Sequence, residues 1–218
     1  MLRWGKKINK VCATGCNPQH TPTLTKGLTV NIRCIPPYAG LPSVFIEEGS
    51  RFGRRFLPDR EYAIAQQGFI KMCVDAVVVN TARRTFFLPK RQVKPMQGYW
   101  IIGGKRIIGR DILTAMQDVF VRETRLLIAV SRFRFVMESE LIWKDREIVP
   151  QDWGSHDFSH IFSVELSPEE RENVSRNLYN AEYDTTEGLR EFTLKDIVAE
   201  QLHPLIRKLH QRVFPESD

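Results

Sequence analysis

The chain has 218 residues, of which 42% are apolar and 10% aromatic, and its formal net charge is +6 at pH 7. This length fits one domain of ordinary size plus an extension, and the apolar content suffices for a buried core, which excludes a chain that is disordered throughout. No apolar run approaches eighteen residues and the basic N-terminus has no apolar segment, so we expect neither a membrane-spanning helix nor a secretory signal. We therefore expect a cytoplasmic protein.

The positive charge is concentrated at the N-terminus. Residues 1–56 hold nine Lys and Arg against two Asp and Glu, whereas the remaining residues hold 23 and 24. The folded part therefore mixes both signs, as most protein surfaces do. Two roles for the extension stay open beside that of a variable segment: a basic tail for anionic partners, and a small zinc site built from Cys12, Cys16, His20 and Cys34.

Residues 1–55 show no helical or alternating periodicity and contain several Pro and Gly turn signals. We therefore expect a poorly ordered extension, with one short strand at 44–46.

The pattern changes at Leu57. A helix is expected from Pro58 or Asp59 to Gly68, followed by two strands, at 72–79 and 84–90, that are joined by a polar turn.

The central expected element is an amphipathic helix that follows an aromatic-glycine turn. Its apolar positions recur at steps of three and four, so they share one face. The six residues on that face are Ile112, Met116, Val119, Phe120, Glu123 and Leu127. A carboxylate on an apolar face is unfavourable unless something pairs with it, and the Gly103-Gly104 turn would let backbone carbonyls and a phosphate come close. This arrangement suits a divalent cation.

The C-terminal part continues the alternation of strands and helices. Strands are expected at 132–143 and 160–166, then a helix that starts with a capping box at Ser167 and ends near Leu178. An acidic loop at 180–188, a short strand at 189–192 and a final helix at 193–213, kinked at Pro204, complete the chain. This order predicts an α+β fold in which a mixed sheet is covered by helices on both faces.

The segment LPKRQVKPMQGYWIIGG, with the following helix that ends in RETRLL, resembles the Nudix superfamily. Its Lys-Arg pair and its Pro-x-Gln-Gly-Tyr-Trp pattern are similar to the branch typified by GDP-mannose mannosyl hydrolase. The resemblance covers about residues 57–192 and implies a Nudix fold, a mixed β-sheet sandwiched between α-helices, in a domain of residues 56–218.

The Nudix box itself is altered in this chain. The family places a glutamate six residues after the glycine, where this chain has Arg110, and an Arg-Glu-x-x-Glu-Glu cluster on the helix, where this chain has Asp118 to Glu123. Among the carboxylates of that pattern only Glu123 remains, because Arg122 replaces its neighbour. The mannosyl-hydrolase branch tolerates a shortened box and attacks the sugar carbon, whereas ordinary members need a row of carboxylates to hold metals and activate water.

The resemblance implies metal ligands at the matching positions. These are the backbone carbonyl of Gly103 and the side chains of Glu123 and Glu182, with Mg²⁺ as the metal and Mn²⁺ as the alternative. The family's histidine in the late loop is Tyr183 here, and a tyrosine with a pKa near 10 is a poor base at neutral pH. A base would therefore come from one of three other residues. They are Asp184, Glu187 and His160.

Substrate contacts are implied around the same segment. Arg91 matches the phosphate clamp, with a surface arginine as the alternative, and Lys90 or Lys105 would share the clamp role. Asp75, on the first strand, would hold Arg91 or the nucleotide. Two aromatic residues would either pack in the turn or stack on a base. They are Tyr99 and Trp100.

Three functions follow from these observations. The first is a Mg²⁺-dependent Nudix-type hydrolase of a nucleoside diphosphate sugar or a related nucleoside diphosphate compound. The second is a catalytically impaired Nudix-fold protein that binds such a nucleotide, because Arg110, Asp118 and Arg122 depart from the family's box. The third, a nucleic-acid-associated protein that uses the extension, is the least favoured. No membrane partner is expected, and the resemblance makes a homodimer possible.

Overall fold

The computed structural model describes residues 23–24, 28–29, 32–35, 40–47, 49–53 and 57–216, and the chain divides into two compact units, 1–51 and 52–218. In the first unit, β1 (Thr23–Leu24) pairs with β2 (Leu28–Thr29), and β3 (Ile32–Ile35) pairs with β4 (Val44–Glu47). The β4 strand agrees with the expected strand at 44–46, whereas β1, β2 and β3 lack an alternating pattern and were not predicted. Cys34 lies in β3, and the other residues of the possible zinc site, Cys12, Cys16 and His20, lie outside the described residues.

The second unit contains most of the predicted elements. In chain order they are α1 (Asp59–Gly68), β5 (Lys71–Asn80), β6 (Thr85–Arg91), β7 (Gly98–Tyr99), β8 (Ile102–Lys105), α2 (Ile112–Thr124), a 3₁₀ turn (Val130–Arg132), β9 (Arg134–Trp143), β10 (Ser155–Glu165), α3 (Pro168–Asn177), β11 (Leu189–Phe192), α4 (Leu194–Ala199) and α5 (Pro204–Val213). The capping box at Ser167 starts α3 as predicted, with the Glu170 N–H donating to the Ser167 hydroxyl.

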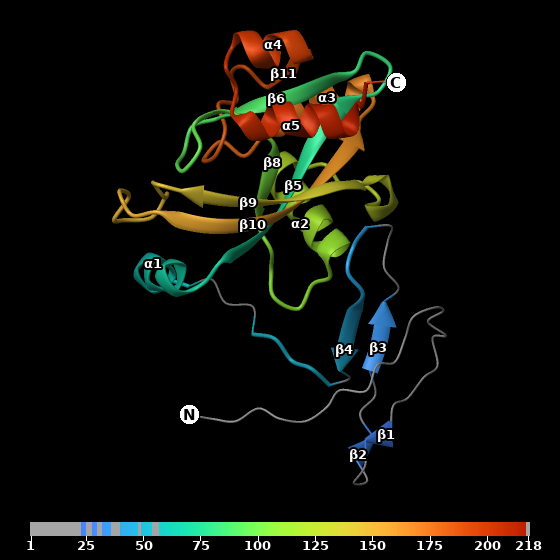
Figure 1. Cartoon of the computed structure of the whole chain (residues 1–218), viewed down its shortest axis with the longest axis vertical. Helices are drawn as coiled ribbons and strands as arrows, with labels where there is room; N and C mark the ends of the chain where they lie inside the picture. The colour runs from blue at the N-terminus through green and yellow to red at the C-terminus, as the bar shows by residue number, and fades with distance from the viewer. Residues whose placement is uncertain are drawn as a thin grey trace. The chain divides into compact units, whose positions relative to one another are not determined.

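These strands form one mixed sheet with the order β11-β6-β5-β10-β9, while β7 pairs with β6 and β8 pairs with β5. The β5–β10 pair is parallel and the other described pairs of this sheet are antiparallel. Helices lie on both faces of the sheet (Figure 1). The predicted α+β arrangement, a mixed sheet between helices, is confirmed.

The core lies on both faces of β5, the central strand. From Cys73 to Val79 every residue except Asp75 is buried, which fits a strand with neighbours on both edges and helices on both faces. On one face, Val77 and Val79 belong to a cluster with Leu205, Ile206 and Leu209 of α5. On the other face α2 packs against β5 and β8. This packing fixes the elements that surround the site.

The prediction of a turn at Gly103 and Gly104 is wrong, because both residues lie in strand β8. A Cβ atom on Gly103 would lie 1.7 Å from the Asp75 Oδ1 atom and 2.8 Å from the Val74 carbonyl oxygen. Glycine is therefore needed here because β8 lies too close to β5 for a side chain, and not because the backbone turns.

Two helix predictions also need correction. Leu127 is 72% exposed, because α2 ends at Thr124 and Arg125 takes the left-handed conformation with φ of 59°. The final helix is not one kinked helix but two, since α4 ends at Ala199 and Pro204 begins α5. Proline is well placed in a first helical turn, where its missing N–H has no partner to lose.

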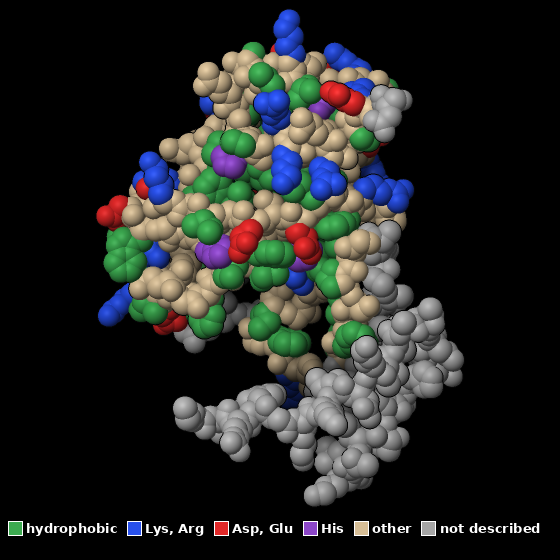
Figure 2. Space-filling view, viewed as in Figure 1, with side chains coloured by type: hydrophobic (Ala, Val, Ile, Leu, Met, Phe, Trp, Pro, Cys, Tyr) green, Lys and Arg blue, Asp and Glu red, His purple; other side chains and the backbone are tan. Residues whose placement is uncertain are grey.

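The strand predicted at 160–166 begins earlier, at Ser155. In the first part of this strand the buried positions are polar, with Asp157 beside Lys71 and Ser159 beside Cys73 of β5. The sequence there lacks the alternation of apolar residues by which a buried strand is predicted. On the face that Figure 2 presents, side chains of both charges are interspersed with apolar ones. No helix in the described part of the chain has the length and apolar character needed to cross a membrane.

Candidate functional site

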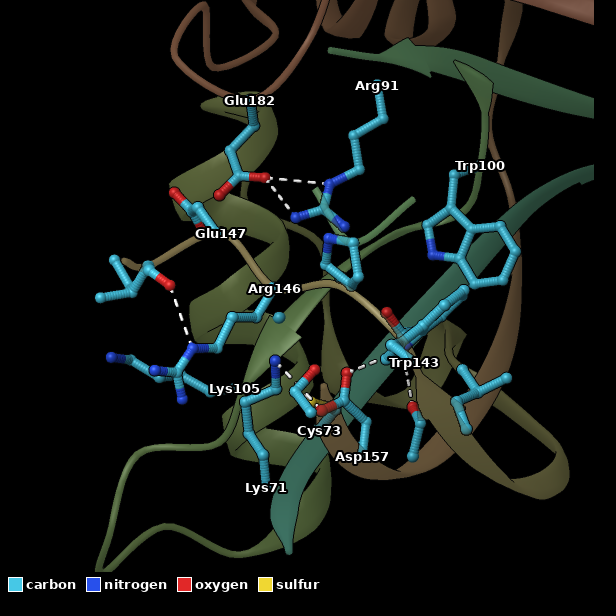
Figure 3. Close-up of a pocket in the computed structure, with 18 of the residues that line it drawn as sticks. Lys71, Cys73, Arg91, Trp100, Lys105, Trp143, Arg146, Glu147, Asp157 and Glu182 are labelled. Carbon is cyan, nitrogen blue, oxygen red and sulfur yellow. Dashed lines mark hydrogen bonds and ion pairs between the residues drawn. The ribbon is translucent and has the colours of Figure 1, made fainter. Parts of the chain in front are cut away.

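A cavity of about 440 Å³ in the second unit brings together seven of the predicted site residues, and this volume suits a small-molecule ligand. They are Asp75, Arg91, Trp100, Gly103, Lys105, Glu123 and Glu182. Figure 3 shows Arg91 and Glu182 at one end of the cavity and Lys71, Cys73 and Asp157 at the other. We call the first the carboxylate end, with Arg91, Glu123, Glu147 and Glu182, and the second the lysine end, with Lys71, Asp157, Ser155 and Gln66.

Glu123 is held at the carboxylate end by α2, whose first turn is fixed by Asp111 accepting the Thr114 N–H at 3.0 Å. The Glu123 side chain is 1% exposed, its Oε1 accepts a hydrogen bond from Arg122 Nε at 2.6 Å, and its Oε2 has no hydrogen-bond partner. Burial raises the pKa of Glu123, and the like charge of Glu182 adds to this, although Arg122 opposes it. A buried carboxylate with an unpaired oxygen can accept a cation or a proton.

The backbone of Gly103 faces away from β5. The Arg106 N–H donates to the Met72 carbonyl at 2.9 Å, so by alternation Asp75 and Gly103 form a non-hydrogen-bonded pair of the antiparallel ladder. In such a pair the N–H and C=O groups of each residue point away from the partner strand. The backbone of Gly103 hydrogen-bonds the Tyr183 hydroxyl instead. Its carbonyl is therefore not used in the ladder with β5.

Tyr183 is buried beside these groups and is not suited to act as a base. It is 2% exposed, and burial raises the pKa of its hydroxyl, with the nearby Glu123 carboxylate adding to the shift. A hydroxyl with a raised pKa keeps its proton at neutral pH, so Tyr183 does not provide a proton acceptor in this cavity.

Asp75 lies on the floor of the cavity, between Gly103 and Ser159. The Ser159 hydroxyl donates a short hydrogen bond to its Oδ2. Burial raises the pKa of Asp75 to about 6, even though Ser159 and Arg91 favour the ionised form. One of the two roles predicted for Asp75 was to hold Arg91. Among the described residues, Asp75 bonds to Ser159 and Arg91 bonds to Glu182, so no hydrogen bond supports that role.

Arg91 is instead held by Glu182. The Arg91 Nε and Nη2 atoms donate to Glu182 Oε2 at 3.0 and 2.8 Å, and the two side chains are 17% and 23% exposed. Burial opposes the charge on Arg91, but Glu182 outweighs it and raises the Arg91 pKa. The predicted phosphate contact and the predicted metal ligand therefore neutralise each other, so a phosphate would have to displace Glu182 from Arg91 and a cation would have to displace Arg91 from Glu182.

Glu147 is a cavity residue that the sequence argument missed. It lies in the loop after β9, and burial together with the like charge of Glu182 raises its pKa. The preceding residue, Arg146, is 1% exposed and donates to the carbonyls of Ala63, Ile148 and Pro150 at 3.0 to 3.1 Å. This buried arginine fixes the loop. A polar loop gives no periodicity, so no sequence signal marked Glu147.

His160 does not lie in the cavity. It is 3% exposed, and its register partner on β5 is Val74, so it faces the side of the sheet opposite to Asp75. Its Nε2 atom lies 3.3 Å from Glu138 Oε1, and burial lowers its pKa. A role for His160 as the base therefore has no support in the geometry.

The other two candidate bases also lie outside the cavity. Asp184 accepts from the Thr186 N–H and hydroxyl at 3.0 and 2.6 Å, and the hydroxyl bond contributes most to lowering its pKa. Glu187 accepts a short hydrogen bond from the Tyr99 hydroxyl and lies 3.5 Å from Lys90 Nζ. Lys90 and Tyr99 are thus placed with Glu187 and not among the residues that line the cavity.

The remaining predicted contacts, Trp100 and Lys105, line the cavity. Trp100 is 5% exposed and packs edge-on against Trp143 at 5.8 Å between ring centroids, so most of its surface belongs to the core. Lys105 Nζ lies 4.0 Å from the centroid of the Tyr62 ring. Burial and the neighbouring cations lower the Lys105 pKa.

Two of the residues that differ from the expected Nudix pattern pair with each other, and the third, Arg122, pairs with Glu123. Arg110 Nε lies 3.0 Å from Asp118 Oδ2, and a Cβ atom on Gly104 would lie 2.3 Å from Arg122 Nη2, so Arg122 covers Gly104. With Arg122 also bound to Glu123, the substituted helix is balanced in charge without a metal.

The oxygen atoms that line the cavity are of the type that binds a hard divalent cation, but they do not form a complete coordination shell. No group of three or more His, Cys, Asp or Glu side chains within the described ranges is arranged to hold a metal ion. Glu123 Oε2, the Gly103 carbonyl and the carboxylate of Glu182 or Glu147 are all oxygen ligands, which Mg²⁺ and Mn²⁺ prefer. Substrate phosphates and water would have to complete such a site.

No protein-family model and no curated protein matches the chain. Several solved structures are similar to part of it. A C. elegans Ap4A hydrolase is 9% identical with a TM-score of 0.41, and the match covers 66% of this chain and 96% of that protein. A Nudix hydrolase from Nitrosomonas europaea is 15% identical with a TM-score of 0.42, and the match covers 66% of this chain and 88% of that protein. The E. coli dihydroneopterin triphosphate pyrophosphohydrolase is 10% identical with a TM-score of 0.42 over 65% and 94%.

Proposed function

We propose that this protein is a Mg²⁺-dependent Nudix-type hydrolase of a nucleoside diphosphate sugar or a related nucleoside diphosphate compound. The observation that carries the proposal is the carboxylate end of the cavity. Buried Glu123 leaves Oε2 unpaired, Gly103 turns its backbone carbonyl away from β5, and Arg91 lies in the same cavity. A cation site beside a guanidinium is suited to a diphosphate.

The charge of the cavity supports a metal cofactor. Six carboxylates and five cationic side chains line it. The carboxylates are Asp59, Asp75, Glu123, Glu147, Asp157 and Glu182, and the cations are Lys71, Arg91, Lys105, Arg122 and Arg146. A diphosphate would add further negative charge to a cavity that has no excess of positive charge. A divalent cation would remove this repulsion, and it would polarise the diphosphate and lower the pKa of bound water.

Within this proposal Glu147 replaces the predicted bases. It lines the cavity, whereas Asp184, Glu187 and His160 do not. Glu147 is exposed on one side, and partial burial together with the like charge of Glu182 raises its pKa, which moves it toward the range in which a base works at neutral pH. Arg91 would bind a phosphate. Glu182 would then be released from Arg91 and would join Glu123 as a ligand of the cation.

A nucleotide-binding protein without hydrolysis is the alternative, and two observations favour it. The described residues provide no preformed group of three metal-ligating side chains. Arg122 and Arg91 also neutralise Glu123 and Glu182, so the two carboxylates do not require a cation for charge balance. Binding and turnover must therefore be measured separately.

The test incubates the full chain and Mg²⁺ with nucleoside diphosphate sugars, nucleoside triphosphates and dinucleotides, and reads free sugar and free phosphate separately. Glu123→Gln should lower turnover at least 100-fold, as expected when a metal ligand is lost, while Glu61→Gln on the exposed side of α1 should not. Full Mg²⁺-dependent turnover by Glu123→Gln would refute the proposal. Thermal stabilisation by one compound without any product would establish the alternative.

A further inference from the structure

The strand β9 is the last strand of the large sheet and has an open edge. In the order β11-β6-β5-β10-β9 it pairs with β10 alone, and no other described strand pairs with its outer side. Its length of ten residues exceeds that of a typical strand. An edge strand presents unpaired N–H and C=O groups, which can bind an extended segment of another chain.

The hydrogen-bond register shows which backbone groups of β9 are free. The Met72 carbonyl accepts from the Arg106 N–H at 2.9 Å, so the backbone groups of Met72 point away from β10 and those of Cys73 point toward it. Cys73 is the parallel register partner of Ser159. Its bonds go to the two residues that flank this partner, so the N–H and C=O of Ser159 point to β9. There Ser159 pairs with Ser139, which therefore uses its backbone groups within the sheet.

The neighbours of Ser139 expose their backbone groups at the open edge, because successive residues of a strand point these groups to opposite edges. The residues concerned are Glu138, Glu140 and Ile142. All three are exposed, and the side chains of Glu138 and Glu140 are 48% and 57% exposed although each contacts a histidine of β10. The edge thus offers three backbone sites at alternate residues, which is the spacing that an added strand requires.

The two sides of this edge carry opposite charges. Helix α5 packs against Ile161, whose register partner on β9 is Met137, so Glu138 and Glu140 project from the other face of the sheet. Helix α5 also packs against β9 and contains no acidic residue. Three of its exposed side chains are cationic, namely Arg207, Lys208 and Arg212. Figure 2 shows Lys and Arg side chains over α5, and Asp or Glu side chains beside His over β9 and β10.

We propose that the open edge of β9 binds an extended segment of a partner protein in which acidic and basic side chains alternate. The side chains of an added strand point alternately to the two faces of the sheet. Those on the α5 side would meet its three cations, and those on the other side would meet Glu138 and Glu140. Glutamates on an edge strand oppose pairing with an acidic or apolar strand, so they select a basic partner face.

This surface is separate from the cavity. The residues that offer free backbone groups and the three cations of α5 do not line it. The inference therefore does not depend on the proposed hydrolysis, and its test needs neither a nucleotide nor a metal.

The first experiment titrates the full chain with two acetylated and amidated octapeptides of the same composition. In one, Glu and Lys alternate, so one face of the strand is acidic and the other basic, whereas in the other the order Glu-Glu-Lys-Lys repeats and each face is mixed. The alternating peptide should bind at least about 5-fold more tightly, and this advantage should shrink at high salt. Equal affinity, or no binding of either peptide at about 1 mM, would overturn the proposal.

Amide hydrogen exchange measured by NMR locates the binding. In the free protein the amides of Glu138, Glu140 and Ile142 should exchange rapidly, while those of Ser139 and Leu141 should be protected. The alternating peptide should slow the first three at least about 10-fold. Protection of these three amides already in the free protein, or peptide binding without any protection, would refute the edge site.

Charge-reversal variants test the two sides separately. Glu140→Lys on one side and Lys208→Glu on the other should each weaken the alternating peptide about 3- to 10-fold, because an attraction is replaced by a repulsion. Glu172→Lys makes the same charge change on the exposed side of α3 and should keep the wild-type affinity. All three sites are exposed, so the unfolding midpoint should stay near that of the wild type. Unchanged affinity in either Glu140→Lys or Lys208→Glu would contradict the proposed alternation.

Discussion

Replacing Asp75 by Asn should stabilise the protein at neutral pH and leave its stability almost unchanged at low pH. Asp75 lies on the cavity floor, where Ser159 donates to its Oδ2, and an Asn side chain keeps an oxygen for that bond. The substitution therefore removes the ionisable proton and the negative charge while it preserves the size of the side chain and its acceptor.

The magnitude follows from the shifted pKa of Asp75. Burial raises it from 3.8 to about 6 in the folded protein, so the folded state holds this proton more tightly than the unfolded state. Stability then falls as the pH rises from about 4 to about 6, because the unfolded chain ionises first. A shift of about two units corresponds to about 3 kcal/mol, which is an upper limit because the side chain keeps some access to the cavity.

Urea denaturation of both proteins at pH 4, 5, 6 and 7 would test this expectation. The free energy of unfolding of Asp75→Asn, minus that of the wild type, should rise by up to about 3 kcal/mol between pH 4 and pH 7. The exposed substitution Asp152→Asn reports the effect of removing one surface charge at the same pH values. If the difference in free energy of unfolding between Asp75→Asn and the wild type does not change with pH, burial does not disfavour the charged form of Asp75 and the reasoning is refuted.

Three further changes test the fold itself. Gly103→Ala should cost about 3 kcal/mol in chemical denaturation, because its Cβ would overlap Asp75 Oδ1 at 1.7 Å and β8 would have to move away from β5, and an unchanged unfolding midpoint would contradict this. Leu127→Asp should change stability by less than about 0.5 kcal/mol, since Leu127 is 72% exposed, whereas a large loss would restore the predicted core role. Ser167→Ala should lower the melting temperature by about 2 to 4 °C through loss of the α3 cap, measured by circular dichroism.

Elements that depend on local pattern could be predicted from the sequence. The capping box at Ser167, the run of apolar residues in β5 and the alternation around β6 identify their elements because each signal lies within a few residues of its cause. The end of α2 could not be predicted in this way. Arg125 takes a left-handed conformation without a glycine to mark it, and the apolar period of the sequence continues to Leu127 beyond the end of the helix.

Which residues line the cavity could be predicted where this depends on strand and helix phase, and not where loops bring residues together, while the roles of these residues stay predictions. The phase of α2 places Glu123 on the buried face, and β5 places Asp75 in the same cavity. Glu147 has no such phase, because its position depends on the hydrogen bonds of buried Arg146 to distant carbonyls. Asp157 was hidden for a related reason, since a polar cavity wall interrupts the apolar pattern of β10.

The charges of the α2 carboxylates are offset by ion pairs within the chain. A row of helix carboxylates needs cations to offset its repulsion, whereas Arg110 offsets Asp118 and Arg122 offsets Glu123 within the chain itself. The repulsion that remains at the carboxylate end involves the loop residues Glu147 and Glu182, because Glu182 raises the pKa of Glu147. If the proposed function holds, a cation would be attracted to the loop side of the cavity as well as to Glu123, and the proposed hydrolysis would depend on these loops as well as on α2.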